Sequence, residues 1–212
     1  MSEFSKTALY ADWPDLPPLV QRAASLAVES GFISSCFPQH GELLRVLARG
    51  RSGGVIGETG TGCGAGLAWM ASAVGPDTRL VSVEIDGKRA AACQALFADL
   101  PNVTVLHGDW RLIEPYGPFD LLVLDGGGGR KRPKDTPADP ASLLKPGGTV
   151  VLDDFYPALE HWPEEVGAID EYGRSVTEAR AYWLQHPDLF VTEIRIAPQV
   201  GTILGTRKAA KS

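Results

Sequence analysis

Short apolar segments alternate with amphipathic segments along most of the chain. The apolar runs have an acidic residue at or beside their ends and cover residues 53–58, 80–86, 103–109, 119–127 and 148–154. Runs of this length are typical of strands buried on both faces. Helical spacing occurs between them, over residues 65–74, 87–100 and 137–148. The alternation predicts a parallel sheet with helices on both sides. Right-handed crossovers then place the acidic strand ends along one edge, where ligands bind.

Helical spacing also indicates helices from Leu19 to Gly31, from His40 to Gly50 and over residues 175–187. Two last apolar runs, 189–198 and 200–208, are joined by a tight turn, and this short link requires antiparallel pairing. We therefore expect an α/β protein with a Rossmann-like, doubly wound, mostly parallel seven-stranded sheet and an antiparallel C-terminal hairpin. Residues 1–212 are expected to form one domain, with residues 1–40 as an N-terminal lid or substrate-binding segment.

Composition narrows the class of protein. Of the 212 residues, 44% are hydrophobic and 22% are charged, as in ordinary soluble globular domains. The formal net charge of −6 argues against a protein that coats nucleic acid or an anionic membrane. The first residues show neither the basic start nor the apolar block of a secretory signal, so we do not expect one. The three cysteines show no zinc spacing, which favours free thiols and a cytoplasmic setting.

The segment VIGETGTGCGAG, residues 55–66, predicts a sharp turn from a strand into a helix. Its glycines allow a ligand to approach the backbone closely. The pattern Gly60, Gly62, Ala65, with Glu84 about 20 residues on, also satisfies the fingerprint of a dinucleotide-binding turn. A tight turn with no ligand is a further interpretation. The glycines alone leave these alternatives open.

Carboxylates at the strand ends favour a ligand other than a dinucleotide. Glu58 precedes the glycines, where it would repel a pyrophosphate and attract an ammonium group. Glu84 can accept hydrogen bonds from both hydroxyls of a ribose, and Asp109 can accept one from the amino group of adenine. Trp110 offers a flat apolar face for the ring. A ligand with an amino group, a ribose and an adenine but no phosphate fits S-adenosylmethionine.

These segments also resemble a known family. ETGTGCG, SVEID and HGDW, in this order, resemble the first three motifs of class I S-adenosylmethionine-dependent methyltransferases, and more narrowly those of the catechol and caffeoyl-CoA type of O-methyltransferase. The resemblance extends from about HGELL through VVLDDFYP and on to the C-terminal hairpin. It implies that the segment before HGELL touches the methionine end of the cofactor. The cofactor-binding residues expected on these grounds are Ser35, Cys36, Glu58, Gly60, Thr61, Gly62, Gly64, Glu84, Ile85, Gly108, Asp109, Trp110 and Asp125.

A second group of carboxylates follows the fourth and fifth predicted strands. Asp125, Asp153 and Asp154 are expected to meet near the transferred methyl group, and they repel one another unless a positive charge joins them. Mg²⁺ is the preferred partner of such oxygen ligands. The family resemblance implies the same, because its members hold Mg²⁺ at matching Asp, Asp and Asn positions. Alternatively, Asp125 contacts the cofactor or substrate directly and the Asp153–Asp154 pair caps the next segment.

The sequence departs from the family beyond Asp125. An aromatic residue and a lysine follow the first metal aspartate in catechol-type enzymes, whereas here four glycines precede Arg130 and Lys131. We expect Lys131 and Asp125 to act in catalysis, with Lys131 as the general base. A solvated basic loop is the alternative for Lys131. His40 is expected at a helix start or on the surface, with an approach to the cofactor or substrate as the alternative.

These observations predict methyl transfer from S-adenosylmethionine to a hydroxyl oxygen of a small molecule, assisted by Mg²⁺. The alternatives are a metal-independent methyltransferase that acts on nitrogen or carbon, a regulatory protein that binds S-adenosylmethionine, and an NAD(P)-dependent oxidoreductase. We expect no nucleic-acid or membrane partner. The resemblance adds that homodimers are common among enzymes of this type.

Overall fold

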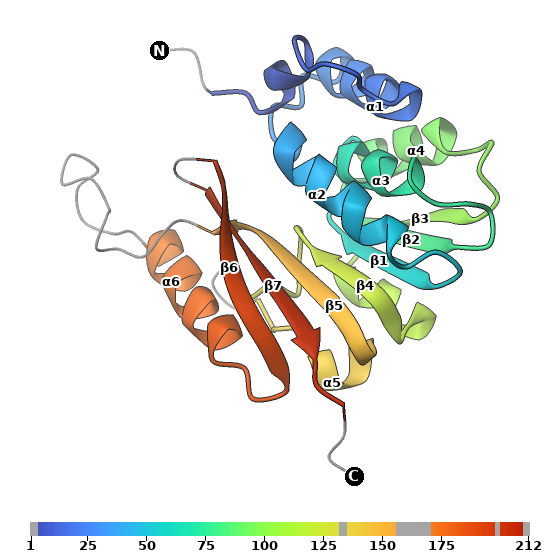
Figure 1. Cartoon of the computed structure of the whole chain (residues 1–212). Coiled ribbons are helices and arrows are strands. Elements are labelled where there is room, and N and C mark those ends of the chain that lie inside the picture. Colours follow the sequence, from blue (N-terminus) through green and yellow to red (C-terminus); the bar gives the residue numbers. More distant parts are fainter. Residues whose placement is uncertain (1–3, 132–134, 156–170, 198–199, 210–212) are drawn as a thin grey trace.

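The computed structural model describes residues 4–131, 135–155, 171–197 and 200–209, with side chains from residue 174 onward in the third range. A seven-stranded sheet runs through it in the order β3-β2-β1-β4-β5-β7-β6 (Figure 1). The strands are β1 Val55–Thr59, β2 Arg79–Glu84, β3 Val103–His107, β4 Phe119–Leu124, β5 Leu144–Phe155, β6 Leu189–Ala197 and β7 Val200–Arg207. Strands β1 to β5 pair in parallel, whereas β7 is antiparallel to both β5 and β6. The predicted fold class is therefore confirmed.

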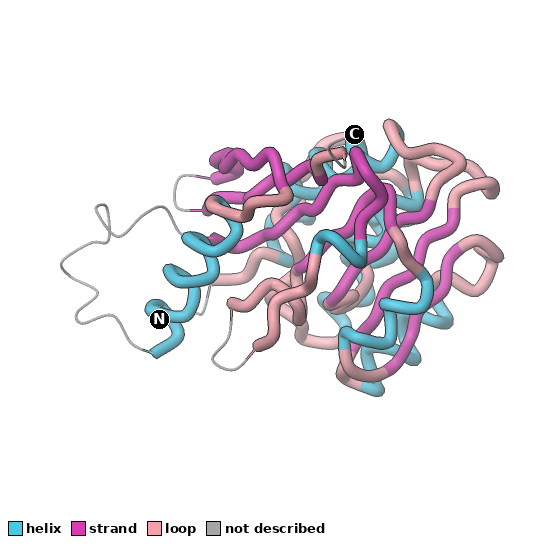
Figure 2. The backbone as a smooth tube through the Cα atoms, turned by 90° about the horizontal axis from the view of Figure 1, so that it is seen from below, coloured by secondary structure: helices cyan, strands magenta, loops and turns pink. Residues whose placement is uncertain are grey.

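Helices cover both faces of this sheet, which Figure 2 traces as a twisted layer. The helical elements are η1 Thr7–Tyr10, α1 Pro18–Glu29, α2 Pro38–Arg49, α3 Ala65–Ala71, α4 Gly87–Leu96, η2 Trp110–Tyr116, α5 Pro140–Leu143 and α6 Glu171–Leu184. Buried side chains of α1 to α4 form a core on one face. Those of η2, α5 and α6 form a second core on the other face. None of the helices in the described part of the chain is long and apolar enough to cross a membrane.

Alternating side chains of the central strands supply the two cores. In β4, Leu121 and Val123 enter the core beneath α1 to α4, while Leu122 and Leu124 enter the opposite one. Both faces of the strand are therefore buried, and this explains why its sequence is apolar without interruption.

The register brings the expected site residues to one edge. Thr59 pairs with both Val83 and Leu124, so that the residues that follow, Gly60, Glu84 and Asp125, emerge at the same level of the sheet. The pairing of β4 with β5 continues this edge toward Asp153.

The structure corrects one predicted helix. The expected helix over residues 137–148 is only four residues long, Pro140–Leu143, and β5 begins at Leu144. Leu144 pairs with Phe119 of β4, and Pro146 has no N–H with which to continue a helix. The local apolar spacing was therefore overridden by strand pairing. All three cysteines are free and buried, as expected for structural thiols.

Candidate active site

A narrow pocket opens at the carboxyl ends of β1 and β4. Here the strand order changes direction, with β2 and β3 on one side of β1 and β4 and β5 on the other. Open parallel sheets bind ligands at this point. The expected cofactor residues that line the pocket are Ser35, Cys36, Glu58, Gly60, Thr61, Gly62 and Asp125. A larger and more open groove lies between η1 and α1, but none of the expected site residues lines it.

The glycine loop, residues 60–64, forms the floor of the pocket. Gly60, Gly62 and Gly64 all have positive φ, of +86°, +57° and +89°. At Gly60 a side chain is excluded for a second reason, because a Cβ atom would lie 2.6 Å from the backbone nitrogen of Gly126. The ends of β1 and β4 therefore meet through backbone alone, and the pocket depends on glycine at position 60.

Glu58 is the buried acid at the entrance to the loop. Only 3% of its surface is exposed, and the Ser82 hydroxyl donates a hydrogen bond of 2.5 Å to its Oε2 atom. Burial raises the pKa of Glu58 to about 8, with further increases from Asp125 and Glu84 and a decrease from the Ser82 bond. The carboxyl group therefore holds its proton near neutral pH until a cation comes close.

Glu84 ends β2 beside the loop, and its carboxylate is held on both sides. Oε2 accepts a hydrogen bond from the Gly62 N–H at 2.7 Å, while Oε1 accepts from the Arg89 guanidinium at 2.8 Å and from the Asp86 N–H at 2.9 Å. Each carboxylate oxygen has about two lone pairs, so Oε2 retains room for one more donor. Arg89 was not expected from the sequence, although it lies five residues after Glu84 in the first turn of α4. Contact with a ribose stays a prediction.

The residues expected at the adenine lie on the open rim beyond the pocket. Ile85 is 73% exposed, and Gly108 donates its N–H to the Glu84 carbonyl at 2.9 Å. Asp109 caps η2 and accepts from the N–H and guanidinium of Arg111. Trp110 packs against Gly127, where an added Cβ would lie 2.2 Å from the indole. Their predicted contacts with adenine remain predictions.

Ser35 and Cys36 line the same pocket, and their contact with the methionine end of the cofactor stays a prediction. Ser35 shares a 2.9 Å hydrogen bond with the Thr7 hydroxyl, and the Tyr10 hydroxyl donates to the Cys36 carbonyl at 3.0 Å. Burial raises the pKa of the Cys36 thiol well above its ordinary value. Cys36 is therefore a neutral thiol here, suited to shaping the pocket.

Asp125, Asp153 and Asp154, called the acidic cluster below, do converge. One carboxylate oxygen from each lies within 4.8 Å of the other two. Burial raises the pKa of Asp125 to about 6, opposed by Lys131 and reinforced by Asp153 and Asp154. Burial also opposes ionisation of Asp153, but His40, Lys131 and Lys6 hold its pKa below the ordinary value. The strand-end argument thus correctly placed all three carboxylates together.

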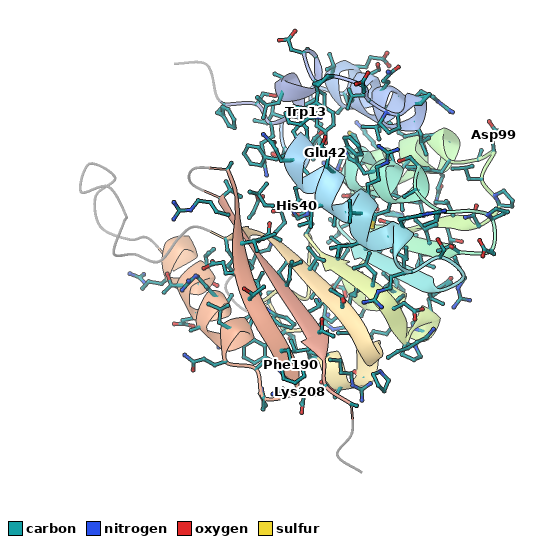
Figure 3. The ribbon with its side chains drawn as sticks, in the orientation of Figure 1. Trp13, His40, Glu42, Asp99, Phe190 and Lys208 are labelled. Carbon is teal, nitrogen blue, oxygen red and sulfur yellow. The ribbon has the colours of Figure 1, made fainter. Side chains whose placement is uncertain are left out.

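His40 contacts this cluster. It does lie at the start of a helix, as expected, but the expectation of a surface position was wrong. The residue is only 1% exposed and lies on α2 facing β7 (Figure 3). Its Nδ1 atom is 3.3 Å from Asp153 Oδ1 and 3.1 Å from the Thr202 hydroxyl, which also donates to Asp153 Oδ1 at 3.2 Å. Asp153 Oδ2 is buried and has no hydrogen-bond partner within the described residues. No local signal connects positions 40, 153 and 202, so only the fold reveals this arrangement.

Two lysines supply positive charge to the cluster. Lys131, 6% exposed, donates from Nζ to the backbone carbonyls of Asp153 at 2.9 Å and Asp125 at 3.3 Å, and lies 3.8 Å from Asp125 Oδ1. Lys6 of the N-terminal segment lies 2.6 Å and 2.9 Å from the two carboxylate oxygens of Asp154. Burial lowers the pKa of Lys6, but the pairing with Asp154 raises it above the ordinary value overall. Lys131 is therefore buried at the cluster, and the solvated-loop interpretation is wrong for it.

Phe155 is the last described residue of β5, and Tyr156, His161 and Trp162, which follow it in the sequence, lie outside the described residues. Phe155 is buried beside Lys131, whose Nζ atom lies 5.9 Å from the centre of the ring.

Comparison with known proteins finds similarity to methyltransferases. Residues 58–155 match a family model described as a methyltransferase domain. A Mycobacteroides abscessus protein assigned as an O-methyltransferase is 31% identical over 146 residues. The chain is thus similar to methyltransferases along the segment that carries Glu58, the glycine loop and the acidic cluster. The alignment with this relative covers 63% of the present chain and 64% of the relative's length.

Solved structures share the same methyltransferase fold along nearly the whole chain. The O-methyltransferase of Bacillus cereus, solved in complex with S-adenosylhomocysteine, superimposes with a TM-score of 0.72 at 18% identity and covers 97% of this chain and 98% of its own. A Staphylococcus aureus protein assigned as a caffeoyl-CoA O-methyltransferase gives a TM-score of 0.70 at 15% identity, over 95% and 98% of the two chains.

The methyltransferase match divides the site in two. Residues 58–155 contain Glu58, the glycine loop and the whole acidic cluster. The side chains that hold the cluster from outside this range are Lys6, His40 and Thr202. These contacts are therefore a feature of this chain beyond the matched domain.

Proposed function

We propose that this protein transfers the methyl group of S-adenosylmethionine to a hydroxyl oxygen of a small molecule, with a divalent metal such as Mg²⁺ assisting. The observation that carries the proposal is the pocket at the sheet's switch point, lined by Glu58 and the glycine loop and bordered by the acidic cluster. The match to a methyltransferase domain and the S-adenosylhomocysteine complex of the Bacillus cereus enzyme support the cofactor. The same match argues against a nicotinamide oxidoreductase.

The pocket's charges suit the cofactor. We assign Glu58 to the ammonium group of S-adenosylmethionine and Glu84 to its ribose. The backbone of Gly60, Thr61 and Gly62 would lie close to the cofactor chain that joins these two groups. S-adenosylmethionine supplies a methyl group on a positively charged sulfur, which buried carboxylates attract. A pyrophosphate would instead be repelled by the carboxylate of Asp125, which has a pKa of about 6.

The acidic cluster has the donor set for a hard divalent ion. It offers carboxylate oxygens alone. Among the described residues the buried Asp153 Oδ2 atom has no partner, which is costly unless a cation or donor binds there. Asp125, Asp153 and Asp154 would hold the ion. When bound, Mg²⁺ lowers the pKa of the acceptor hydroxyl and orients its oxygen.

The residues of the chain would handle the remaining steps. As the acceptor oxygen bonds to the methyl carbon, the carbon–sulfur bond breaks and the hydroxyl proton must leave. Asp125 can accept that proton only at a carboxylate oxygen that is not bound to the ion. Lys131, 3.8 Å from Asp125 Oδ1, is the second candidate base and would first have to lose a proton. Phe155 and the glycine loop would keep water away from this point.

Metal-independent methyl transfer is the second candidate function. It is favoured by Lys6 and Lys131, because these ammonium groups already lie close to carboxylates of the cluster. The repulsion among the three aspartates therefore does not by itself require a metal. Nitrogen or carbon acceptors would fit such a site.

A substrate screen tests both candidates. Release of S-adenosylhomocysteine is measured with panels of phenols, alcohols, amines and carbon acids, in excess Mg²⁺ or in excess chelator. We expect turnover with hydroxylated compounds in Mg²⁺ and its loss in chelator. Turnover that survives the chelator, with the methyl group on nitrogen or carbon in the product's mass spectrum, would establish the second candidate instead.

We expect cofactor affinity to rise with pH through Glu58. Below a pKa of about 8 the buried carboxyl group is neutral, so binding of an ammonium group must displace its proton. Affinity should therefore increase from pH 6 to pH 8, by up to about tenfold per unit, and level off above. Calorimetric titration with S-adenosylhomocysteine at several pH values measures this.

Glu58→Gln should flatten the pH profile, while Glu114→Gln, at an exposed glutamate of η2, should leave it unchanged. An equally steep profile in Glu58→Gln and wild type would contradict the assignment of Glu58 to the ammonium group.

A further inference from the structure

Lys6 makes the most direct ionic contact with the acidic cluster. Its Nζ atom lies 2.6 Å from Asp154 Oδ2 and 2.9 Å from Asp154 Oδ1, across 148 positions of sequence. The lysine side chain is 17% exposed and the aspartate side chain 36% exposed, so the pair is partly screened from water. Lys6 Nζ also lies 5.3 Å from the centre of the Phe37 ring. The contact is therefore built into the site and differs from an ordinary surface ion pair.

Neighbouring bonds hold Lys6 in place and connect it to the cofactor pocket. Thr7 donates its hydroxyl to the Phe32 carbonyl at 2.6 Å and its N–H to the Ile33 carbonyl at 3.2 Å. The Thr7 hydroxyl also meets the Ser35 hydroxyl of the pocket wall. A shift of Lys6 would therefore also displace the segment from Phe32 to Ser35, which lines the pocket.

The three aspartates differ in which of their carboxylate oxygens already have a partner. Asp154 has an ammonium group on both oxygens, whereas Lys131 reaches only to 3.8 Å from Asp125 and Asp153 keeps one buried oxygen without a partner. A divalent ion could approach Asp153 Oδ2 and Asp125 without breaking a bond to a carboxylate oxygen. At Asp154, however, it would meet Lys6 at the same atoms.

We propose that Lys6 is an internal cation that competes with a divalent metal for Asp154 and so sets the metal affinity of the site. The inference rests on the metal-assisted part of the proposed function. Without the ion, Lys6 neutralises Asp154 and holds the N-terminal segment against the cluster. When the ion binds, repulsion between the two cations separates Lys6 from Asp154 and releases that segment. Metal uptake and closure of the segment over the pocket then oppose each other.

The test compares the Mn²⁺ affinity of wild type, Lys6→Gln and Lys6→Arg at constant pH and ionic strength. Mn²⁺ is chosen because it prefers carboxylate oxygens and its free ion is quantified by electron paramagnetic resonance. We expect Lys6→Gln to bind Mn²⁺ roughly tenfold more tightly or better than wild type, since one positive charge is removed next to the ligands. Lys6→Arg, which keeps the charge, should stay near wild type.

One control variant and one further readout complete the design. Lys208→Gln removes a lysine at the opposite end of the sheet (Figure 3) and should leave the affinity unchanged. Hydrogen exchange measured in Mg²⁺ supplies a second readout. The Thr7 amide, bonded to the Ile33 carbonyl, should exchange faster in wild type when Mg²⁺ is added, and already exchange fast in Lys6→Gln.

Each outcome decides the matter. Tighter binding in Lys6→Gln alone supports competition, including the case in which wild type binds no Mn²⁺ under the same conditions. Equal affinity in wild type and Lys6→Gln overturns the inference and leaves the metal-assisted function standing. No Mn²⁺ binding in any variant overturns both the inference and the metal-assisted part, while methyl transfer itself is still judged by the substrate screen.

Discussion

Asp153→Asn is expected to lower kcat/KM for methyl transfer about 10²- to 10³-fold, the equivalent of several kcal/mol of lost electrostatic stabilisation. Asp153 is the most buried member of the acidic cluster, at 1% exposure, and its Oδ2 atom has no partner in the part of the chain that the structure describes. The amide removes the charge on which a divalent ion and the ordering of His40 depend. Steady-state rates of S-adenosylhomocysteine release, in saturating cofactor, measure the effect.

The cofactor pocket provides an internal check on this variant. Asp153 does not line the pocket, so the affinity of Asp153→Asn for S-adenosylhomocysteine should stay within about threefold of wild type, less than 1 kcal/mol. Asp99→Asn, at an exposed aspartate near the end of α4 (Figure 3), is the matched control and should change neither quantity. Full activity in Asp153→Asn would rule out a role for the cluster in catalysis.

Gly60→Ala should disrupt both the fold and cofactor binding. The φ of +86° costs an alanine about 1–2 kcal/mol, and the clash with the Gly126 backbone adds about 1–3 kcal/mol, because neither strand end can move freely. We expect the free energy of unfolding to fall by about 2–5 kcal/mol, the sum of these costs. S-adenosylhomocysteine binding should be lost. Urea denaturation and calorimetric titration measure the two effects.

Gly147→Ala separates conformational strain from the backbone clash. Gly147 has a similar φ of +79°, but an added Cβ would meet no atom within 4 Å. This variant should lose only the conformational cost of about 1–2 kcal/mol and bind the cofactor normally. Equal destabilisation by the two variants would show that the contact between residues 60 and 126 is unimportant.

Local signals in the sequence were sufficient for most of the fold. Uninterrupted apolar runs predicted the strands because both faces of β1, β2, β4 and β5 contribute to the cores. The short link between β6 and β7 fixed their antiparallel pairing. The predicted helix over residues 137–148 failed because Leu144 gains a strand partner in Phe119, which no local pattern reveals.

The candidate site was predicted where strand ends alone position the residues. Glu58, Glu84, Asp125 and Asp153 were placed on one edge because each ends or follows a parallel strand. Prediction failed where a residue reaches the edge from another element, as with His40 from α2 and Lys6 from the N-terminal segment. Such contacts leave no periodic signal, since they join positions separated by more than a hundred residues.

The amino-acid sequence by itself determined the wound sheet, the glycine loop and the gathering of carboxylates at one edge. Periodicity, turn residues and strand direction are properties of short segments, and parallel strands must end on the same side. Only the tertiary structure decided the electrostatics of that edge. It buries Glu58 with Ser82 and raises the pKa of Asp125. It also leaves Asp153 Oδ2 without a partner among the described residues and brings Lys6 to Asp154. Charge and burial depend on which distant groups pack together, and that is settled when the whole chain folds.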